Sequence, residues 1–117
     1  MFAVTRSMLL AFGAVLRPTA TIAHSGVTMG EGGQVMAGAV IQPDVRIGAN
    51  AVVNTRASVD HDCILGDHCH IAPGAVLCGA VTIGEDTHIG AGATIRRDVP
   101  DGMIVYSESQ RRERPRG

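Results

Sequence analysis

The stretch that decides the fold is VDHDCILGDHCHIAPGAV, residues 59–76, in which an aliphatic residue opens each group of six. The same spacing continues in both directions, so that twelve aliphatic residues stand at every sixth position: Met29, Val35, Ile41, Ile47, Val53, Val59, Leu65, Ile71, Leu77, Ile83, Ile89 and Ile95. Neither an α-helix nor an ordinary strand has a period of six, so the pattern indicates a repeat architecture. We predict an all-β fold, a left-handed parallel β-helix of hexapeptide repeats in which three units close one triangular coil.

The repeat also predicts what fills each position of a coil. The aliphatic residues fill the interior, and a small or compact residue occupies the cramped corner four positions later: Gly33, Ala39, Val45, Ala51, Ala57, Cys63, Cys69, Ala75, Val81, Thr87, Ala93 and Val99. Glycine follows the aliphatic residue at one place in every coil, as Gly30, Gly48, Gly66 and Gly84. We expect the glycines to serve tight turns that need positive φ.

Three segments are expected along the chain. Residues 1–15 form an N-terminal cap or remnant, although Arg6 followed by a short apolar run leaves a targeting segment as the alternative. Residues 16–106 form the β-helix domain, with about four regular coils over 29–100 and an imperfect first coil over 16–28, slightly out of phase. Residues 107–117 form a flexible basic tail with four arginines and two glutamates.

Composition narrows the classes of function. The formal net charge is −1, with ten arginines and no lysine, so we expect no nucleic acid as a partner. No stretch is long enough for a transmembrane helix, so no membrane partner is expected. The three cysteines are odd in number, and Cys63 and Cys69 occupy corner positions, which favours structural burial. These unpaired cysteines predict a cytoplasmic location.

The residues that could carry chemistry interrupt the repeat in the second and third coils. His61 occupies a turn position that Pro43, Gly79 and Arg97 hold in other coils. Asp62 follows it and could orient the ring or stabilise its protonated form, which makes His61 a candidate general base and Asp62 its partner.

A second pair of histidines should meet on one edge of the prism. His70 and His88 are eighteen residues apart, one full coil, so we expect them to stack. Taken alone, a histidine on such a surface is usually just solvated.

Metal binding is the competing interpretation of these histidines. A zinc site like that of the γ-class carbonic anhydrases, which have a similar fold, would need a spacing that His61, His68 and His70 do not have. Cys69 should point inward and so could not act as a ligand beside these histidines. No metal is therefore expected. No serine, cysteine or threonine sits in a nucleophile arrangement, which favours direct transfer over a covalent intermediate.

Residues 35–95 resemble the β-helix domain of a specific group, the sialic acid O-acetyltransferase and nucleotide-amino-sugar N-acetyltransferase family of hexapeptide-repeat acetyltransferases. The motifs that carry the resemblance are Val53-Asn54-Thr55, Asp60-His61-Asp62-Cys63, Gly66-Asp67, His70-Ile71-Ala72-Pro73-Gly74 and Gly79.

The resemblance implies transfer of acetyl from acetyl-CoA, as co-substrate, to an amine or hydroxyl of a sugar or nucleotide-sugar. His61 matches the family's catalytic base, Asp62 the acidic residue beside it, and His70 a histidine that contacts acetyl-CoA. Gly79, Gly90 and Ala91 match backbone positions that line the CoA groove. Family members form homotrimers with this groove between adjacent prisms.

The sequence departs from that family at both ends of the repeats. Relatives usually carry an N-terminal α/β domain with a glycine-rich loop for the acceptor, and residues 1–15 contain no such loop. Ile95 passes directly into Arg96-Arg97-Asp98-Val99-Pro100, where relatives usually have further coils. The alternative function is therefore a non-catalytic β-helix that serves as a trimerisation or interaction scaffold.

Overall fold

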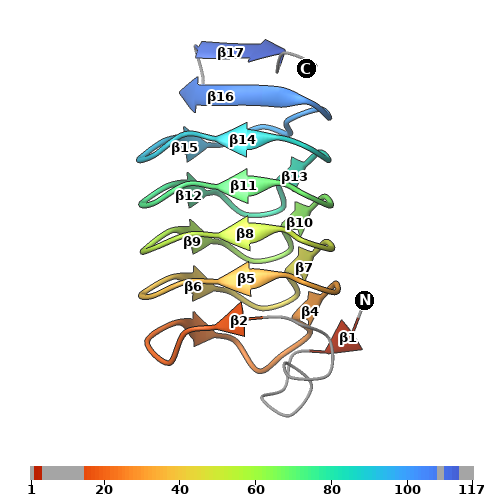
Figure 1. The fold of residues 1–117 in the computed structure, drawn as a ribbon, viewed down its shortest axis with the longest axis vertical. Coiled ribbons are helices and arrows are strands. Elements are labelled where there is room, and N and C mark those ends of the chain that lie inside the picture. Colours follow the sequence, from red (N-terminus) through yellow and green to blue (C-terminus); the bar gives the residue numbers. More distant parts are fainter. Residues whose placement is uncertain (1, 4–14, 108–109, 114–117) are drawn as a thin grey trace.

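The structure is a computed structural model, and it describes residues 2–3, 15–107 and 110–113. Strands of these residues form three sheets, which are the three faces of a triangular prism (Figure 1). Between Val15 and Ile95, successive strands along the chain follow the repeating order of sheets A, B and C, so each set of three strands completes one coil. The predicted left-handed parallel β-helix of hexapeptide repeats is confirmed, with about five turns, which are the four regular coils and the imperfect first coil.

Each parallel strand within the regular coils is two residues long, and its second residue points inward. Sheet A contains β4 (Thr28–Met29), β7 (Arg46–Ile47), β10 (Ile64–Leu65) and β13 (Thr82–Ile83). Sheet B contains β2 (Val15–Leu16), β5 (Gln34–Val35), β8 (Val52–Val53), β11 (His70–Ile71), β14 (His88–Ile89) and the longer β16 (Met103–Ser107). Sheet C contains β3 (Thr21–Ile22), β6 (Val40–Ile41), β9 (Ser58–Val59), β12 (Val76–Leu77) and β15 (Thr94–Ile95).

The interior of the prism is filled as the repeat predicts. All twelve aliphatic residues of the six-residue period are at most 1% exposed. The corner residues are buried with them, including Thr87, whose Oγ1 satisfies itself by donating to the Gly84 carbonyl over 2.8 Å. Each fully buried aliphatic side chain stabilises the fold by about 1.5–3 kcal/mol before the cost of ordering the chain.

Only six of the described glycines match the expectation of positive φ. Gly26, Gly32, Gly38, Gly74, Gly92 and Gly102 have φ between 69° and 73°. In the other coils the same turn position is taken by Asp44, Asn50, Arg56, Asp62, His68, Ala80 and Asp86, all with positive φ. Aspartate and asparagine tolerate this left-handed region better than other side chains, which explains why they hold four of these seven positions.

The glycine that follows each sheet A strand has a different purpose. A Cβ on Gly66 would lie 2.6 Å from the Glu85 backbone nitrogen, and one on Gly48 would lie 2.6 Å from that of Asp67. Gly30 and Gly84 face the backbone of the next coil in the same way. These glycines are therefore required because the coils approach each other too closely for any side chain, not because of φ.

The first coil is out of phase, as its sequence predicts. Leu16 pairs with Val35 and Ile22 pairs with Ile41, each nineteen residues apart, whereas Met29 pairs with Ile47 at the regular eighteen. The turn between Ile22 and Met29 therefore contains one extra residue. That insertion ends within the turn, so every later coil keeps the regular period.

An antiparallel strand covers one sheet at each end of the stack. At the N-terminal end β1 (Phe2–Ala3) pairs with β4, and most of the expected 1–15 cap lies outside the described residues. At the C-terminal end β17 (Gln110–Glu113) pairs with β16, as Figure 1 shows at the top of the prism. This strand differs from the flexible tail expected over 107–117; residues 114–117 lie outside the described part.

Backbone pairing and two arginine side chains hold the β17 strand. The Arg111 guanidinium donates to the carbonyls of Asp98 and Arg97 over 2.8 and 3.2 Å. Arg112 lies over the Tyr106 ring at 5.5 Å and donates to its hydroxyl over 3.1 Å. A segment without aliphatic side chains is thus ordered through hydrogen bonds, which hydrophobic periodicity does not register.

Candidate functional site

The turn over residues 60–63, which joins sheet C to sheet A, holds the first group of predicted site residues. We call the turn formed by Asp60, His61 and Asp62 the His61 corner. Asp60 Oδ1 accepts the His61 backbone N–H over 2.8 Å, and His61 Nδ1 lies 2.9 Å from Asp62 Oδ2. Asp62 has φ 60°, which turns its carboxylate back toward the ring that precedes it. The two carboxylates therefore fix the backbone and the ring of His61 separately.

The hydrogen bond to Asp62 decides the state of the imidazole. An ionised carboxylate only accepts hydrogen bonds, so Nδ1 carries the proton and Nε2 presents a lone pair. The Asp62 hydrogen bond raises the pKa of His61 above its ordinary value, and the negative charge of Asp60 raises it further. Both His61 and Asp62 side chains are 59% exposed, so reactants can reach the ring. This arrangement makes Nε2 a more basic proton acceptor than an ordinary histidine.

The turn one coil further along brings Gly79 against this ring. A Cβ on Gly79 would lie 2.7 Å from His61 Nε2 and 2.8 Å from Cε1, so the imidazole lies across the Gly79 Cα. The Ala80 amide donates to the His61 carbonyl over 2.8 Å and ties the two turns together. His61, Asp62 and Gly79 are thus one cluster.

The backbone amide of Gly79 is open. In four other turns a side-chain oxygen accepts the amide at this position: Asp67 for Ala49, Asn54 for Thr55, Asp60 for His61 and Asp101 for Glu85. Among the described residues, the amides of Glu31, Ala37, Asp67 and Ala91 have no such acceptor. Gly79 follows Cys78 instead of an aspartate, and among the described residues its amide makes no hydrogen bond. An open N–H beside a proton-accepting imidazole can donate to an oxygen on which negative charge develops.

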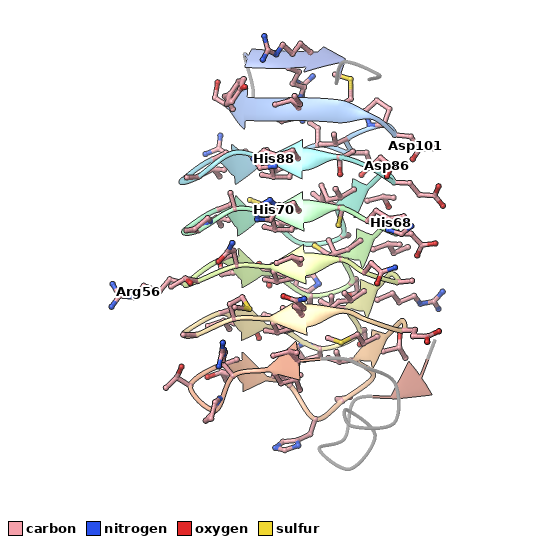
Figure 2. The ribbon with its side chains drawn as sticks, in the orientation of Figure 1. Arg56, His68, His70, Asp86, His88 and Asp101 are labelled. Atoms are coloured by element: carbon pink, nitrogen blue, oxygen red, sulfur yellow. The ribbon has the colours of Figure 1, made fainter. Side chains whose placement is uncertain are left out.

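A second cluster lies on the face of sheet B. His70 and His88 stand one above the other there (Figure 2), with ring centroids 4.7 Å apart in an edge-to-face arrangement, which confirms the predicted stacking. Asn54 Nδ2 lies 3.1 Å from His70 Nε2. Asn54 Oδ1 accepts the Thr55 amide over 2.7 Å, so Nδ2 must be the donor and His70 Nε2 the acceptor. Asn54 therefore places the proton of a neutral His70 on Nδ1.

Gly90 and Ala91 lie at a third place, the turn that joins sheet B to sheet C. The Gly90 amide donates to the Val105 carbonyl over 2.7 Å as part of the strand ladder, so it is not available to a ligand. A Cβ on Gly90 would lie 3.2 Å from the Tyr106 ring. Ala91 is exposed, and no described residue accepts a hydrogen bond from its amide.

Within one chain the structure brings together only part of the predicted site. His61, Asp62 and Gly79 share the edge between sheets C and A, whereas His70 lies on sheet B, the opposite face of the triangle. Gly90 and Ala91 lie at the edge between sheets B and C. A ligand that touched all six residues would have to lie between two prisms.

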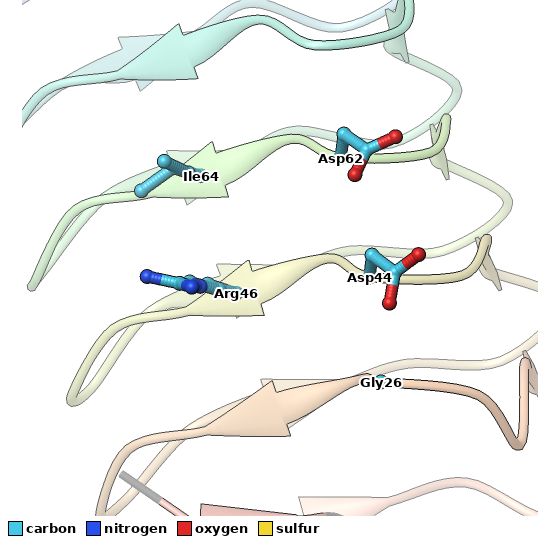
Figure 3. Close-up of a pocket in the computed structure, with 5 residues that line it drawn as sticks. All are labelled: Gly26, Asp44, Arg46, Asp62 and Ile64. Atoms are coloured by element: carbon cyan, nitrogen blue, oxygen red, sulfur yellow. The ribbon is translucent and has the colours of Figure 1, made fainter.

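Two shallow depressions border the His61 corner, one on each side. The larger, of about 410 Å³, lies on the sheet A side and is lined by Gly26, Asp44, Arg46, Asp62 and Ile64 (Figure 3). The smaller, of about 170 Å³, lies on the sheet C side; Ser58, Asp60, Val76 and Cys78 contribute to its lining. His61 therefore stands on a ridge with a carboxylate of the same turn facing each depression.

The sequence placed Asp60 and Asn54 in the motifs but gave neither a role in the site. Both precede a turn residue whose amide they accept, and this position, directly after an inward aliphatic residue, could have identified them.

Within residues 2–3, 15–107 and 110–113, no group of three or more histidine, cysteine, aspartate or glutamate side chains is placed to hold a metal ion. The same residues include no helix long and apolar enough to cross a membrane.

The fold and the repeat define the class to which this chain is similar. Residues 47–79 and 62–97 match the bacterial transferase hexapeptide family, described as six repeats. In its β-helix, the chain resembles the hexapeptide-repeat acetyltransferases.

Particular relatives make the likeness more specific. The acetyltransferase domain of PglB from Neisseria gonorrhoeae FA1090, in complex with acetyl coenzyme A, has a TM-score of 0.75 and 35% identity, over 87% of this chain and 58% of that one. PerB from Caulobacter crescentus, in complex with CoA and GDP-perosamine, has a TM-score of 0.66 and 36% identity, over 86% of this chain and 56% of that one. GDP-perosamine N-acetyltransferase of Escherichia coli O157:H7 is 34% identical over 91 residues, 73% of this chain. This chain spans 41% of that relative's length.

Proposed function

We propose that this chain is the β-helix part of an acetyltransferase that transfers acetyl from acetyl-CoA to an amine or hydroxyl of a sugar or nucleotide-sugar. The observation that carries the proposal is the His61 corner: an exposed imidazole, made more basic by two carboxylates, beside the open amide of Gly79. The likeness to the PglB acetyltransferase domain and to PerB supports the donor and the acceptor class.

His61 would act as the general base of a direct transfer. Its Nε2 takes the proton of the acceptor amine or hydroxyl while that nitrogen or oxygen bonds to the thioester carbonyl carbon. The carbon–sulfur bond then breaks, and the departing thiolate takes up that proton from Nε2, which restores neutral His61. The Gly79 amide would donate to the carbonyl oxygen as charge develops on it. General base catalysis contributes about 10²–10⁴-fold to such a step.

The positions of the other residues favour a homotrimer. His70 and Ala91 lie on the opposite side of the prism from His61, so they could contact the same acetyl-CoA only from a neighbouring subunit. Gly90 would contribute by leaving room rather than by its amide, since that amide is already bonded to Val105. No metal takes part in this mechanism. We also propose a cytoplasmic location, which is supported by the free thiols of Cys63, Cys69 and Cys78.

The test is calorimetric titration with acetyl-CoA, followed by an acetyl-transfer assay over a panel of amino-sugars and nucleotide-sugars. We expect saturable binding, and His61→Ala should lower the transfer rate at least about 10²-fold while leaving acetyl-CoA bound. His68→Asn is the matched control, because His68 is another turn histidine and asparagine keeps its positive φ. No acetyl-CoA binding by a folded trimer would instead support a non-catalytic scaffold.

A further inference from the structure

We propose that Gly79 is a positioning residue for the base: the absence of a side chain at Gly79 is what allows the His61 ring to lie against this turn and bond to Asp62. This role depends on the function proposed for His61, but it concerns the side chain of residue 79 rather than its amide. It explains why a glycine is found where the backbone does not require one.

The backbone at Gly79 has no need of glycine. Gly79 is the first of the two central residues of its turn, and it is not among the glycines with positive φ. Residues with side chains hold this position in the other turns between Met29 and Ile95: Glu31, Ala37, Pro43, Ala49, Thr55, His61, Asp67, Pro73, Glu85 and Ala91. Local conformation would therefore accept alanine at 79.

The space that a side chain at 79 would need is occupied by the His61 imidazole. The three heavy atoms nearest to a Cβ at this position are Nε2, Cε1 and Cδ2 of His61, at 2.7, 2.8 and 3.3 Å. At Gly48 and Gly66, by contrast, backbone atoms of the next coil lie within 2.7 Å of the added carbon. Only the imidazole, and not the coil, would have to move for a side chain at 79.

Movement of the His61 ring would leave the core intact but would break its contact with Asp62. His61 is largely exposed, so its ring can rotate into solvent without disturbing the core. Rotation would carry Nδ1 away from Asp62 Oδ2, the contact that contributes most to the raised pKa of His61. A methyl group at 79 should therefore leave the fold intact and remove the orientation and the added basicity of the base.

The contact with Gly79 also fixes where the reacting nitrogen, His61 Nε2, lies. Nδ1 faces Asp62, and Nε2 lies close to Gly79 of the following coil. An acceptor group that gives its proton to Nε2 would lie next to the open Gly79 amide, where the carbonyl oxygen of the thioester can reach the same turn.

The test is a titration of the His61 ring by NMR in Gly79→Ala, without acetyl-CoA or acceptor. We expect the pKa of His61 to fall toward its ordinary value while the melting temperature stays near that of the wild type. Ala37→Ser, an added atom at the same turn position away from His61, should leave the titration unchanged. In the transfer assay Gly79→Ala should lower kcat about 10–100-fold, since small misplacements of a catalytic group cost that much.

The titration separates this proposal from the proposed function. An unchanged pKa of His61 in Gly79→Ala would overturn the positioning role, whatever the enzyme does. A lowered pKa in a protein that transfers no acetyl group would keep the role of Gly79 and reject the function.

Discussion

At the residue scale, the chemistry of His61 is set by its two neighbours in sequence. Asp60 binds its backbone amide and Asp62 binds its ring, so the histidine is held from both sides while its side chain stays 59% exposed. The hexapeptide repeat predicted the position of His61 on a turn, and adjacency alone suggested Asp62. The repeat could not predict the contact between the His61 ring and Gly79, because a period in sequence fixes the register between coils and not the rotamer of an exposed side chain.

The pH dependence of activity tests the pair His61 and Asp62. A base must be neutral, so activity should rise as pH passes upward through the raised pKa of His61. Asp62→Asn weakens the largest cause of that shift, so the acidic limb of the kcat/KM profile should move to lower pH and the maximal rate should fall. Asparagine tolerates the positive φ of this position, so the backbone is kept.

Asp44→Asn is the control, because Asp44 holds the same turn position one coil earlier, with φ 63°. Its profile should match the wild type. The same linkage applies to stability: protonated His61 favours the folded state below its ordinary pKa, and this contribution disappears as pH rises through the raised value. Equal profiles for Asp62→Asn and the wild type would refute the pairing.

The cysteines give a second prediction at this scale. Burial raises the pKa of the Cys69 thiol to about 12 and also raises that of Cys63, whose Sγ donates to the Cys78 carbonyl over 3.1 Å. Cys78 is partly exposed. A thiol reagent at pH 8 should therefore modify Cys78 alone in the native protein and all three cysteines after unfolding. Rapid native labelling of Cys78→Ser would contradict this.

At the element scale, the unit of stability is the contact between one turn and the turn above it. The sequence predicted the glycine column after the sheet A strands but assigned it to positive φ. Its actual cause is a distance between coils, which becomes visible only when residues eighteen apart are placed in contact. The sequence predicted the stacking of His70 and His88 correctly because that argument used the same interval of eighteen.

Gly66→Ala tests this explanation. The added carbon would lie 2.6 Å from the Glu85 nitrogen and 2.7 Å from the Gly84 carbonyl carbon, and neither backbone atom can move without shifting a whole coil. We expect unfolding in urea to show a loss of about 1–3 kcal/mol. Gly79→Ala is the comparison variant, with an expected change within about 0.5 kcal/mol, since only an exposed ring must yield. A similar loss for both variants would mean that the coils separate more easily than the structure indicates.

At the scale of the whole molecule, the terminal strands of a stack of coils expose edges that can pair with other chains. Here β1 covers the sheet A edge at one end and β17 covers the sheet B edge at the other, both antiparallel to strands that otherwise pair in parallel. The sequence did not predict β17, because its residues have no hydrophobic period and its anchor, Arg111, acts on two backbone carbonyls. Composition indicated a solvated tail where hydrogen bonds form a strand.

Removal of residues 108–117 should therefore expose the outer edge of β16. Exposed edges of this kind pair with other chains, so we expect self-association that increases with protein concentration in sedimentation velocity. Removal of 114–117 alone keeps β17 and should leave the assembly state of the full chain unchanged. If the longer truncation behaves like the shorter one, β17 does not protect the edge.

The constant rise from coil to coil fixes the spacing of turns along the edge that holds His61. Strands in one sheet repeat about every 4.8 Å, so Gly79 lies one coil from His61 and Arg97 lies two coils from it, about 10 Å away. An insertion of eighteen residues between these turns would add one coil and leave every side chain facing the same way. Distances along this edge can therefore change only by whole coils, so the length of a ligand that contacts two turns determines how many coils separate them.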